Sequence, residues 1–232
     1  MFDGKMKALT FSYDDGVTQD IRLVEIFNKY NLKCTFNLNS DCLGMEGRLE
    51  RPEYNVNHTK VKPEDVCHIY SGHEVAVHTL THPNLTVLSD EEVIRQVEED
   101  RIKLSELCGY DVVGMAYPGG HFDDRVVNLI ENHTGVKYSR EVQRTKSFEP
   151  FTDLYRYKGT LYHHMDWNEL FTMGEEFINL KADTPKVFYI WGHAYEFDIH
   201  PERWEQFDEF CRMISGKSDI FYGTNKEILL AK

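Results

Sequence analysis

A regular alternation of short apolar strands with amphipathic helices constrains the fold of this chain more than any other feature. The residue pattern predicts strands at 8–12, 34–38, 74–77, 112–117, 137–140 and 186–191. It predicts helices at 20–30, 63–70, 89–108, 123–132, 168–180 and 202–214, followed by a final strand and helix. Such alternation is typical of an α/β protein with a mainly parallel sheet, either open or closed into a barrel. Residues 39–60 are polar and irregular, and we expect a long loop there that flanks or covers a site.

The length and composition are those of one folded unit. The chain has 232 residues, of which 41% are hydrophobic and 28% charged, and it contains no internal repeat, linker or break in composition. We therefore expect a single domain over residues 1–232. The formal net charge of -13 excludes nucleic acid and membrane as natural partners, because both repel an acidic surface. Nothing in the sequence indicates an oligomeric state.

Two features bear on the location of the protein. No stretch has the roughly 18 uninterrupted apolar residues that a membrane span needs, and the start of the chain lacks the apolar run of a signal peptide. The five cysteines form no CxxC pair, and their odd number favours reduced thiols over a disulfide framework. We therefore expect a cytoplasmic protein without a signal peptide or an anchor.

Polar side chains follow several of the predicted strands. Asp14 and Asp15 come after the first strand, and His78 and His82 come after the third. Two imidazoles four residues apart fall on the same side of a turn, and imidazole is the commonest protein ligand for a transition metal. Taken alone, each pair has a plainer explanation. The histidine spacing can arise by chance, and the aspartates can form a solvated turn or a helix cap.

The positions of these residues along the predicted sheet favour an enzyme. Tyr117 and Gly119 follow the fourth strand, and His193 follows the strand at 186–191. In a parallel barrel the carboxyl ends of the strands gather on one face, where active sites are found. The coincidence of the acidic pair, the histidine pair and His193 at strand ends is therefore stronger evidence than any of them alone.

Five short motifs in this order resemble those of the polysaccharide deacetylases with a NodB-type domain, also called carbohydrate esterase family 4. They are TFSYDDG at 10–16, HTLTH at 78–82, MAYPGG at 115–120, DW at 166–167 and WGH at 191–193. The resemblance covers about residues 7 to 228. It implies a distorted (β/α) barrel and hydrolysis of an N-acetyl, or sometimes O-acetyl, group on an amino sugar or oligosaccharide. It also implies one divalent metal, commonly zinc, with cobalt, nickel, manganese and iron as alternatives.

The resemblance also implies roles for five residues. Asp15, His78 and His82 would hold the metal, Asp14 would act as general base, and His193 as general acid. The residue types agree with this chemistry. Two neutral imidazoles and one carboxylate leave open positions on a zinc ion for water, and the ion lowers the pKa of that water toward about 7. An imidazolium can protonate the leaving amine near neutral pH.

The sequence departs from the family pattern at two positions. The third motif normally carries an arginine that orients the catalytic base, and Ala116 stands there instead. Arg140, at the end of the next predicted strand, is our candidate substitute. The fifth motif has Trp191 where the family usually has leucine. A backbone N–H at the turn formed by Pro118 and Gly119 is a candidate donor to the oxyanion.

Several further residues are candidates for contact with the sugar. His163 and His164 precede Asp166, and either ring can face substrate; the alternative is a solvated pair beside a turn. Tyr117 and Trp167 can stack on a sugar face, or they can pack in the core or wall of the protein.

Two other functions remain open from the sequence. One is an amide or cyclic-ureide hydrolase with the same fold, which can work without a metal. The intact set of Asp15, His78 and His82 argues against the metal-free form. The other is a carbohydrate-binding relative without catalysis. Asp14 and His193 argue against it, whereas Ala116 leaves it open.

Overall fold

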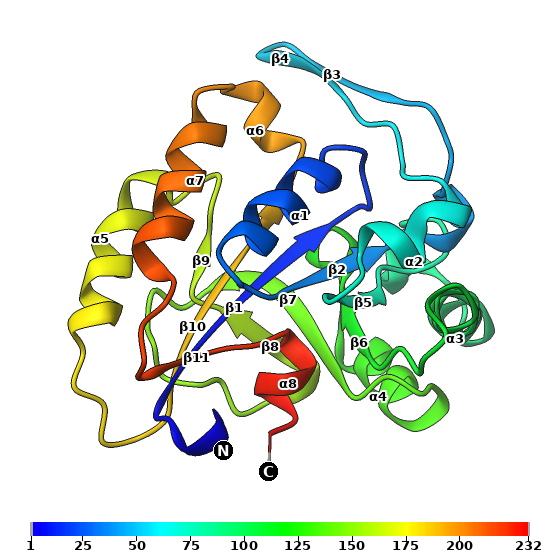
Figure 1. The fold of residues 1–232 in the computed structure, drawn as a ribbon. Coiled ribbons are helices and arrows are strands. Elements are labelled where there is room, and N and C mark those ends of the chain that lie inside the picture. Colours follow the sequence, from blue (N-terminus) through cyan, green and yellow to red (C-terminus); the bar gives the residue numbers. More distant parts are fainter. Residues whose placement is uncertain (1, 232) are drawn as a thin grey trace.

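A sheet of parallel strands forms the centre of the computed structural model, which describes residues 2–231 (Figure 1). Its strands are β1 (Lys7–Asp14), β2 (Cys34–Leu38), β5 (Glu74–Val77), β6 (Gly114–Ala116), β7 (Tyr138–Arg144), β8 (Tyr157–Gly159), β9 (Leu161–Tyr162), β10 (Lys186–His193) and β11 (Ile220–Tyr222). The order is β8-β7-β6-β5-β2-β1-β10-β9, with β11 paired to β1, and every pairing in it is parallel. The predicted α/β fold with a parallel sheet is confirmed.

One continuous segment, residues 157–162, closes the sheet into a barrel. Its first part, β8, pairs with β7, and its second part, β9, pairs with β10. Between them, the carbonyl of Thr160 accepts from the amide of Lys146 at 3.0 Å, and its amide donates to the carbonyl of Tyr189 at 2.8 Å. The register shifts between β7 and β8, and only one residue pair joins β5 to β6. These irregularities make the barrel the distorted one that the motifs imply.

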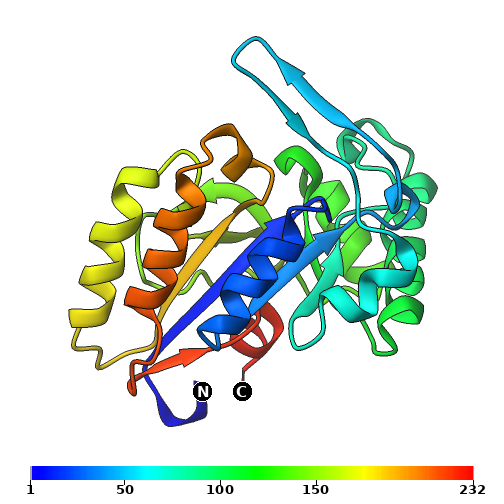
Figure 2. The same ribbon diagram turned by 45° about the horizontal axis from the view of Figure 1, so that its top comes forward.

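Helices surround the barrel, as Figures 1 and 2 show. They are α1 (Asp20–Lys29), α2 (Val66–Ile69), α3 (Asp90–Cys108), α4 (Asp124–His133), α5 (Trp167–Asn179), α6 (Glu196–Ile199), α7 (Arg203–Ile214) and α8 (Asn225–Leu229). The helix α3 is capped at its N-terminus by Ser89, whose side chain accepts from the backbone amide of Glu92, and at its C-terminus by Gly109 in the left-handed conformation. At the end of the barrel where the strands begin, Asn225 of α8 donates to the hydroxyl of Tyr189 at 2.7 Å.

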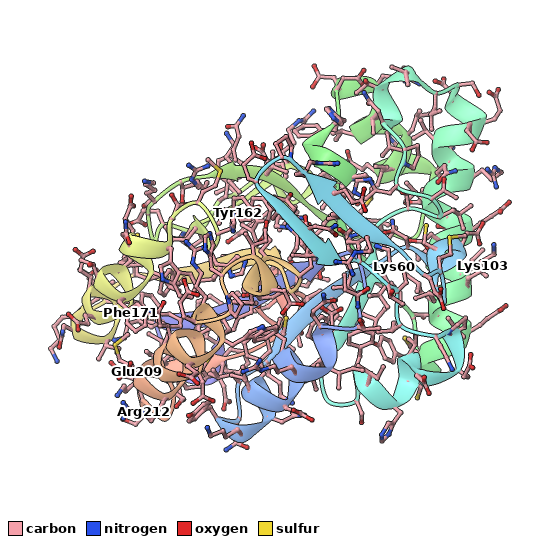
Figure 3. All side chains as sticks on the ribbon, turned by 90° about the horizontal axis from the view of Figure 1, so that it is seen from above. Lys60, Lys103, Tyr162, Phe171, Glu209 and Arg212 are labelled. Atoms are coloured by element: carbon pink, nitrogen blue, oxygen red, sulfur yellow. The ribbon has the colours of Figure 1, made fainter. Side chains whose placement is uncertain are left out.

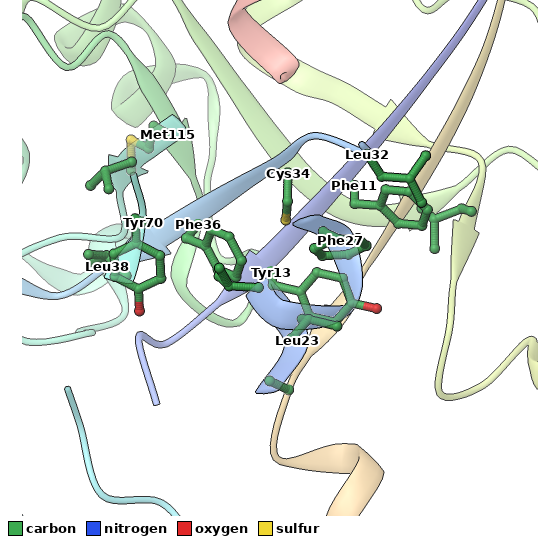
Figure 4. Packing of buried hydrophobic residues seen from close by; sticks show 14 of the residues in the cluster. Phe11, Tyr13, Leu23, Phe27, Leu32, Cys34, Phe36, Leu38, Tyr70 and Met115 are labelled. Atoms are coloured by element: carbon green, nitrogen blue, oxygen red, sulfur yellow. The ribbon is translucent and has the colours of Figure 1, made fainter. Parts of the chain in front are cut away.

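Aromatic side chains fix the position of β1, the strand that carries the acidic pair. Phe11 and Tyr13 are fully buried, and the ring of Phe11 lies 4.7 Å from that of Phe27 in α1 (Figure 4). Leu23 and Phe27 are four residues apart, so both point from α1 toward the sheet. Burying each of these large side chains stabilises the fold by about 1.5–3 kcal/mol. The position of β1 in the core is therefore rigid.

The segment 39–60, expected to be a loop, contains a β-hairpin of β3 (Arg48–Arg51) and β4 (Tyr54–Asn57). The hairpin projects from the body of the protein beside the ends of the strands (Figure 2). Each of its strands is only four residues long, β3 is mostly exposed, and β4 has a single buried residue, Val56, so no alternation of buried apolar residues marks them in the sequence. The elements β8, β9 and α6 escape prediction because they are only three, two and four residues long.

Within residues 2–231, no helix is long and apolar enough to cross a membrane. The five cysteines are free thiols, as their number and spacing predict.

Candidate metal and catalytic site

The predicted site residues meet at the carboxyl end of the barrel. Asp14 is the last residue of β1, and its register partners are His193 in β10 and Asn37 in β2. His78 directly follows β5, and Arg140 lies in β7. Figure 3 shows this end of the molecule from above, with the hairpin in front. The parallel sheet therefore brings together residues that are far apart in the sequence.

Asp15, His78 and His82 form a cluster that fits one metal ion. The Oδ1 atom of Asp15 lies 3.9 Å from the Nε2 atom of His78 and 3.8 Å from that of His82. All three donor atoms lie within 4.8 Å of one another. Two donors bound to one ion at about 2.1 Å in tetrahedral geometry lie roughly 3.4 Å apart. The observed separations therefore suit a single ion after small shifts of the side chains.

An unusual backbone presents these three side chains. Asp15 (φ 84°) and His82 (φ 60°) both have positive φ, as does Thr79 (φ 68°) within the histidine turn. Non-glycine residues in this region cost of order 1–3 kcal/mol each and persist only where the surroundings hold them. Here the amide of Asp15 donates to the carbonyl of Asn37 at 3.0 Å, and the amide of His82 donates to the hydroxyl of Thr79 at 3.1 Å. The histidines thus sit on a tight turn, as predicted, but not on a helix.

Hydrogen bonds set His78 in the form that a metal requires. Its Nδ1 lies 2.7 Å from the carbonyl oxygen of Ala116, to which it donates, so the lone pair of Nε2 faces Asp15 and His82. Burial lowers the pKa of His78 to about 4, so the ring is neutral at physiological pH. Its amide donates to the carboxylate of Asp100 at 3.1 Å, which fixes the backbone at the start of the turn.

Two residues that the sequence did not reveal hold Asp15. The Nε2 atom of His58 lies 3.1 Å from Oδ2, the oxygen that does not face the histidine pair. The ammonium of Lys60 donates to the backbone carbonyl of Asp15 at 2.7 Å and lies 3.7 Å from Oδ1. Burial alone would raise the pKa of Asp15. The hydrogen bond from His58 and the charge of Lys60 outweigh burial and hold that pKa well below its usual range. The carboxylate is therefore ionised and oriented.

Asp14 is held from two sides. Its side chain is buried, and its Oδ1 accepts from the side-chain Nδ2 of Asn37 at 2.8 Å. Its Oδ2 accepts from the guanidinium of Arg140, which is itself 1% exposed. Arg140 and Ala116 are register partners on neighbouring strands. The guanidinium therefore reaches Asp14 from the strand next to the one on which the family pattern places its arginine.

The ring of His193 faces Asp14 on one side and the carboxylate of Glu196 on the other. Its Nε2 lies 4.0 Å from Oδ2 of Asp14, and its Nδ1 lies 3.2 Å from Oε1 of Glu196, one turn further along the chain. Burial alone would lower the pKa of His193. The charge and hydrogen bond of Glu196, followed by the charges of Asp15 and Asp14, raise it to about 9. A glutamate three residues after the histidine was the available sequence signal for Glu196.

His163 is not a surface residue facing substrate, which corrects one expectation. It is 1% exposed, its Nε2 donates to Glu196 at 2.7 Å, and its Nδ1 accepts from the hydroxyl of Tyr13 at 3.3 Å. A side chain at Gly192 would place its Cβ 2.1 Å from the ring of His163. The glycine in the WGH motif therefore leaves space for the ring of His163, which holds Glu196 by a hydrogen bond.

The other predicted contact residues have different surroundings. Tyr117 is 1% exposed and stacks on Phe122, so its ring packs in the protein and presents no face to a sugar. Gly119 is exposed at the turn after β6 and has φ 57°. His164 is half-buried, with its Nδ1 accepting from Arg203 at 3.4 Å. Trp167, also half-buried, donates to Gln206 at 3.1 Å, and the Arg203 guanidinium covers its ring at 4.8 Å.

Comparison with known sequences gives one family match. The profile of the polysaccharide deacetylase family matches residues 2–139. Chitin deacetylase 1 from Cryptococcus neoformans var. grubii is 27% identical over 116 residues, which cover 50% of this chain and 22% of that protein. The chain therefore matches only about a fifth of the length of this relative.

Solved structures with the same fold include enzymes and a pseudoenzyme. A family 4 carbohydrate esterase from Streptomyces lividans, in complex with acetate, has a TM-score of 0.56 at 14% identity, covering 95% of this chain and 92% of that chain. A mutant of peptidoglycan deacetylase PdaC from Bacillus subtilis has 0.57 at 19%, covering 97% and 91%. A CE4 family pseudoenzyme from Bacillus anthracis has 0.58 at 17%, covering 96% and 65%. At these identities the likeness shows the fold alone.

Proposed function

The chain belongs to the polysaccharide deacetylase family of hydrolases, and from this premise we propose that it removes acetyl groups from an acetylated amino sugar or oligosaccharide. We propose N-acetyl groups as the main target, with O-acetyl groups as the variant. The observation that carries the proposal is the cluster of Asp15, His78 and His82 beside the facing pair of Asp14 and His193. We further propose that the chain acts as one catalytic domain.

The three clustered side chains would hold one divalent ion. Two imidazoles and one carboxylate suit zinc, and cobalt, nickel, manganese and iron(II) accept the same donor set. When bound, the ion supplies Lewis-acid polarisation of the acetyl carbonyl and lowers the pKa of water in the site. The donation from His78 Nδ1 to Ala116 and the contact of His58 with Asp15 support this role, because such outer partners orient metal ligands.

Asp14 is the general base in this proposal. It takes a proton from the attacking water as the water oxygen bonds to the acetyl carbon. The hydrogen bonds from Asn37 and Arg140 hold its carboxylate in one orientation, so no reorganisation is needed when the proton moves. We propose that Arg140 serves here in place of the arginine missing at Ala116.

His193 is the general acid. As the bond between the acetyl carbon and the sugar nitrogen breaks, His193 donates its proton to that nitrogen, and acetate and a free amine leave. The raised pKa of about 9 supports this role, because the ring carries a proton near neutral pH. Glu196 orients the ring through Nδ1 and compensates its charge.

Contacts with the rest of the substrate are proposed for three residues at the rim. The backbone N–H of Gly119 is a candidate donor to the developing oxyanion. Trp167 and His164 lie at the start of α5 and just before it, beyond the end of β9, and both are part-exposed. They are candidates for contact with a neighbouring sugar ring.

Acetate release from short N-acetylglucosamine oligomers tests the reaction. We expect wild-type protein loaded with zinc to release acetate, and Asp14→Asn to lose most of this activity while keeping the metal. His133→Ala removes an exposed histidine at the end of α4 and serves as the matched control with unchanged activity. Loss of metal-dependent acetate release only in Asp14→Asn supports the assignment. Metal binding without acetate release from any acetylated saccharide would favour the other amide hydrolases or a carbohydrate-binding relative.

A further inference from the structure

We propose that Trp191 is a positioning residue that holds the general base and the general acid at the same time. The proposal rests on the functions proposed above for Asp14 and His193. It follows from a chain of contacts in which the indole of Trp191 lies between the groups that fix these two side chains. Trp191 itself lies in β10, two residues before His193, and is 4% exposed.

The first arm of this chain leads from Trp191 to the base. The guanidinium carbon of Arg140 lies 4.3 Å from the centre of the Trp191 ring, a distance at which a cation is attracted to the face of an indole. The same guanidinium donates to Oδ2 of Asp14. Its Nη1 donates to the backbone carbonyl of Glu141 at 3.2 Å, and its Nε has no hydrogen-bond partner among the described residues. The contact with the indole therefore restrains the guanidinium together with these two hydrogen bonds.

The second arm leads from Trp191 to the acid. The ring of Tyr162 stacks on Trp191 with centres 4.2 Å apart and planes 9° from parallel. Tyr162 and Trp191 are register partners on β9 and β10, so the backbone sets this stack. The hydroxyl of Tyr162 donates to Oε1 of Glu196, the oxygen that also faces Nδ1 of His193. The stack therefore restrains Oε1 of the carboxylate that faces the acid, while Oε2 accepts from His163 at 2.7 Å and from the backbone amide of His193 at 3.0 Å.

The neighbouring strands leave room for the indole and the guanidinium. A Cβ at Gly159 in β8 would lie 2.8 Å from Cδ1 of Trp191, so only glycine fits there without a shift. Ala116, the register partner of Arg140, carries only a methyl group. The two departures from the family pattern, alanine at 116 and tryptophan at 191, therefore belong to one arrangement. The arginine comes from the adjacent strand, and an indole supports it.

Two substitutions of Trp191 distinguish its support of the catalytic groups from a contribution to core packing alone. Trp191→Phe keeps an aromatic face, whereas Trp191→Leu keeps apolar volume without one. We expect Trp191→Leu to lower kcat about 10- to 100-fold with KM within about twofold, because misplacing a catalytic group by about 1 Å costs about 100-fold. We expect Trp191→Phe to retain kcat within about fivefold, and the alkaline pH limb of kcat to shift only in Trp191→Leu.

A second tryptophan supplies the matched control. Trp204 in α7 is 2% exposed and also carries an arginine on its ring, with the Arg22 guanidinium carbon 4.6 Å from the ring centre. Trp204→Leu should lower the melting temperature as much as Trp191→Leu does, without changing kcat or its pH profile. Equal effects of the two substitutions on kcat would overturn the proposal, because they would reduce it to general packing.

A measurement on the resting protein separates this proposal from the proposed function. The Nε–H proton of Arg140 belongs to the guanidinium that lies over the indole, so the ring current of Trp191 alters its NMR chemical shift. We expect Trp191→Leu to move this signal and to lower the pKa of the His193 ring, with Trp191→Phe close to wild type. If wild-type protein releases no acetate, the proposed function fails. The NMR comparison still tests whether Trp191 positions Arg140 and His193. An unchanged Arg140 signal and an unchanged His193 titration in Trp191→Leu would refute the positioning role.

Discussion

Glu196→Gln gives the sharpest prediction about the acid. The substitution keeps the shape of the side chain but removes the charge that, with its hydrogen bond, most raises the pKa of His193. Burial opposes the charged ring, so we expect the pKa of His193 to fall from about 9 to its ordinary 6.5 or below. With a pKa of 6.5, the protonated fraction of the ring at pH 8 falls about 30-fold, whereas at pH 6 it changes by less than about twofold.

The assay is an NMR titration of the His193 ring in metal-free protein, so that no bound ion contributes to the pKa. The direction of the pKa shift of His193 determines how its protonation changes the stability of the fold with pH. The raised pKa means that protonation of His193 stabilises the fold fully below about pH 6.5, and that this stabilisation is lost as the pH rises through about 9. In the active enzyme, the alkaline limb of kcat should move to lower pH in Glu196→Gln.

A matched control is Glu202→Gln. Glu202 is an exposed glutamate whose carboxylate lies 3.9 Å from the ring of His200, outside the site. This change should leave the titration of His193 as it is in wild type. If the pKa of His193 stays near 9 in Glu196→Gln, the reasoning that assigns the charge of the acid to Glu196 is refuted.

Three further predictions concern residues that contact the proposed base, the proposed metal ligands and the support of the proposed acid. Arg140→Ala should lower kcat about 10- to 100-fold with metal content unchanged, because the base loses the group that orients it; full activity would remove Arg140 from the mechanism. His58→Ala should weaken metal affinity about 10- to 100-fold in a chelator competition titration, because the free oxygen of Asp15 loses its partner. Gly192→Ala should destabilise the fold by about 1–3 kcal/mol, because a Cβ there would overlap the ring of His163; an unchanged melting temperature contradicts this.

The sequence predicts the parts of the site that depend on strand order. Asp14, His78 and His193 each lie at or just after the end of an apolar strand, and parallel pairing brings such ends together. Their meeting at one end of the barrel therefore follows from local patterns and one rule of topology. The structure also brings Arg140 to Asp14, although nothing in the residue spacing states how far its side chain reaches.

The residues that the sequence missed come from irregular segments. His58 and Lys60 follow a hairpin of two four-residue strands, and their place beside Asp15 depends on tertiary contacts such as the bridge between Val17 and Lys60. Glu196 lies in a helix of four residues, too short for a periodic signal.

The sequence left two alternatives open for Tyr117, contact with a sugar and packing in the core or wall, and the structure shows the packing. A tyrosine at a strand end can point into the site or into the wall, and only packing decides between them. Here the hydroxyl of Tyr117 donates to the carbonyl of Tyr155 at 2.9 Å, which holds the ring away from the surface.

Metal content and acetate release, measured on the same samples of wild-type protein and His78→Ala, test the central claim most directly. The account predicts about one divalent ion per chain in wild type, and loss of both the ion and acetate release from N-acetylglucosamine oligomers in His78→Ala. The absence of metal from both proteins, even after zinc is added back, would contradict the claim that Asp15, His78 and His82 form a metal site.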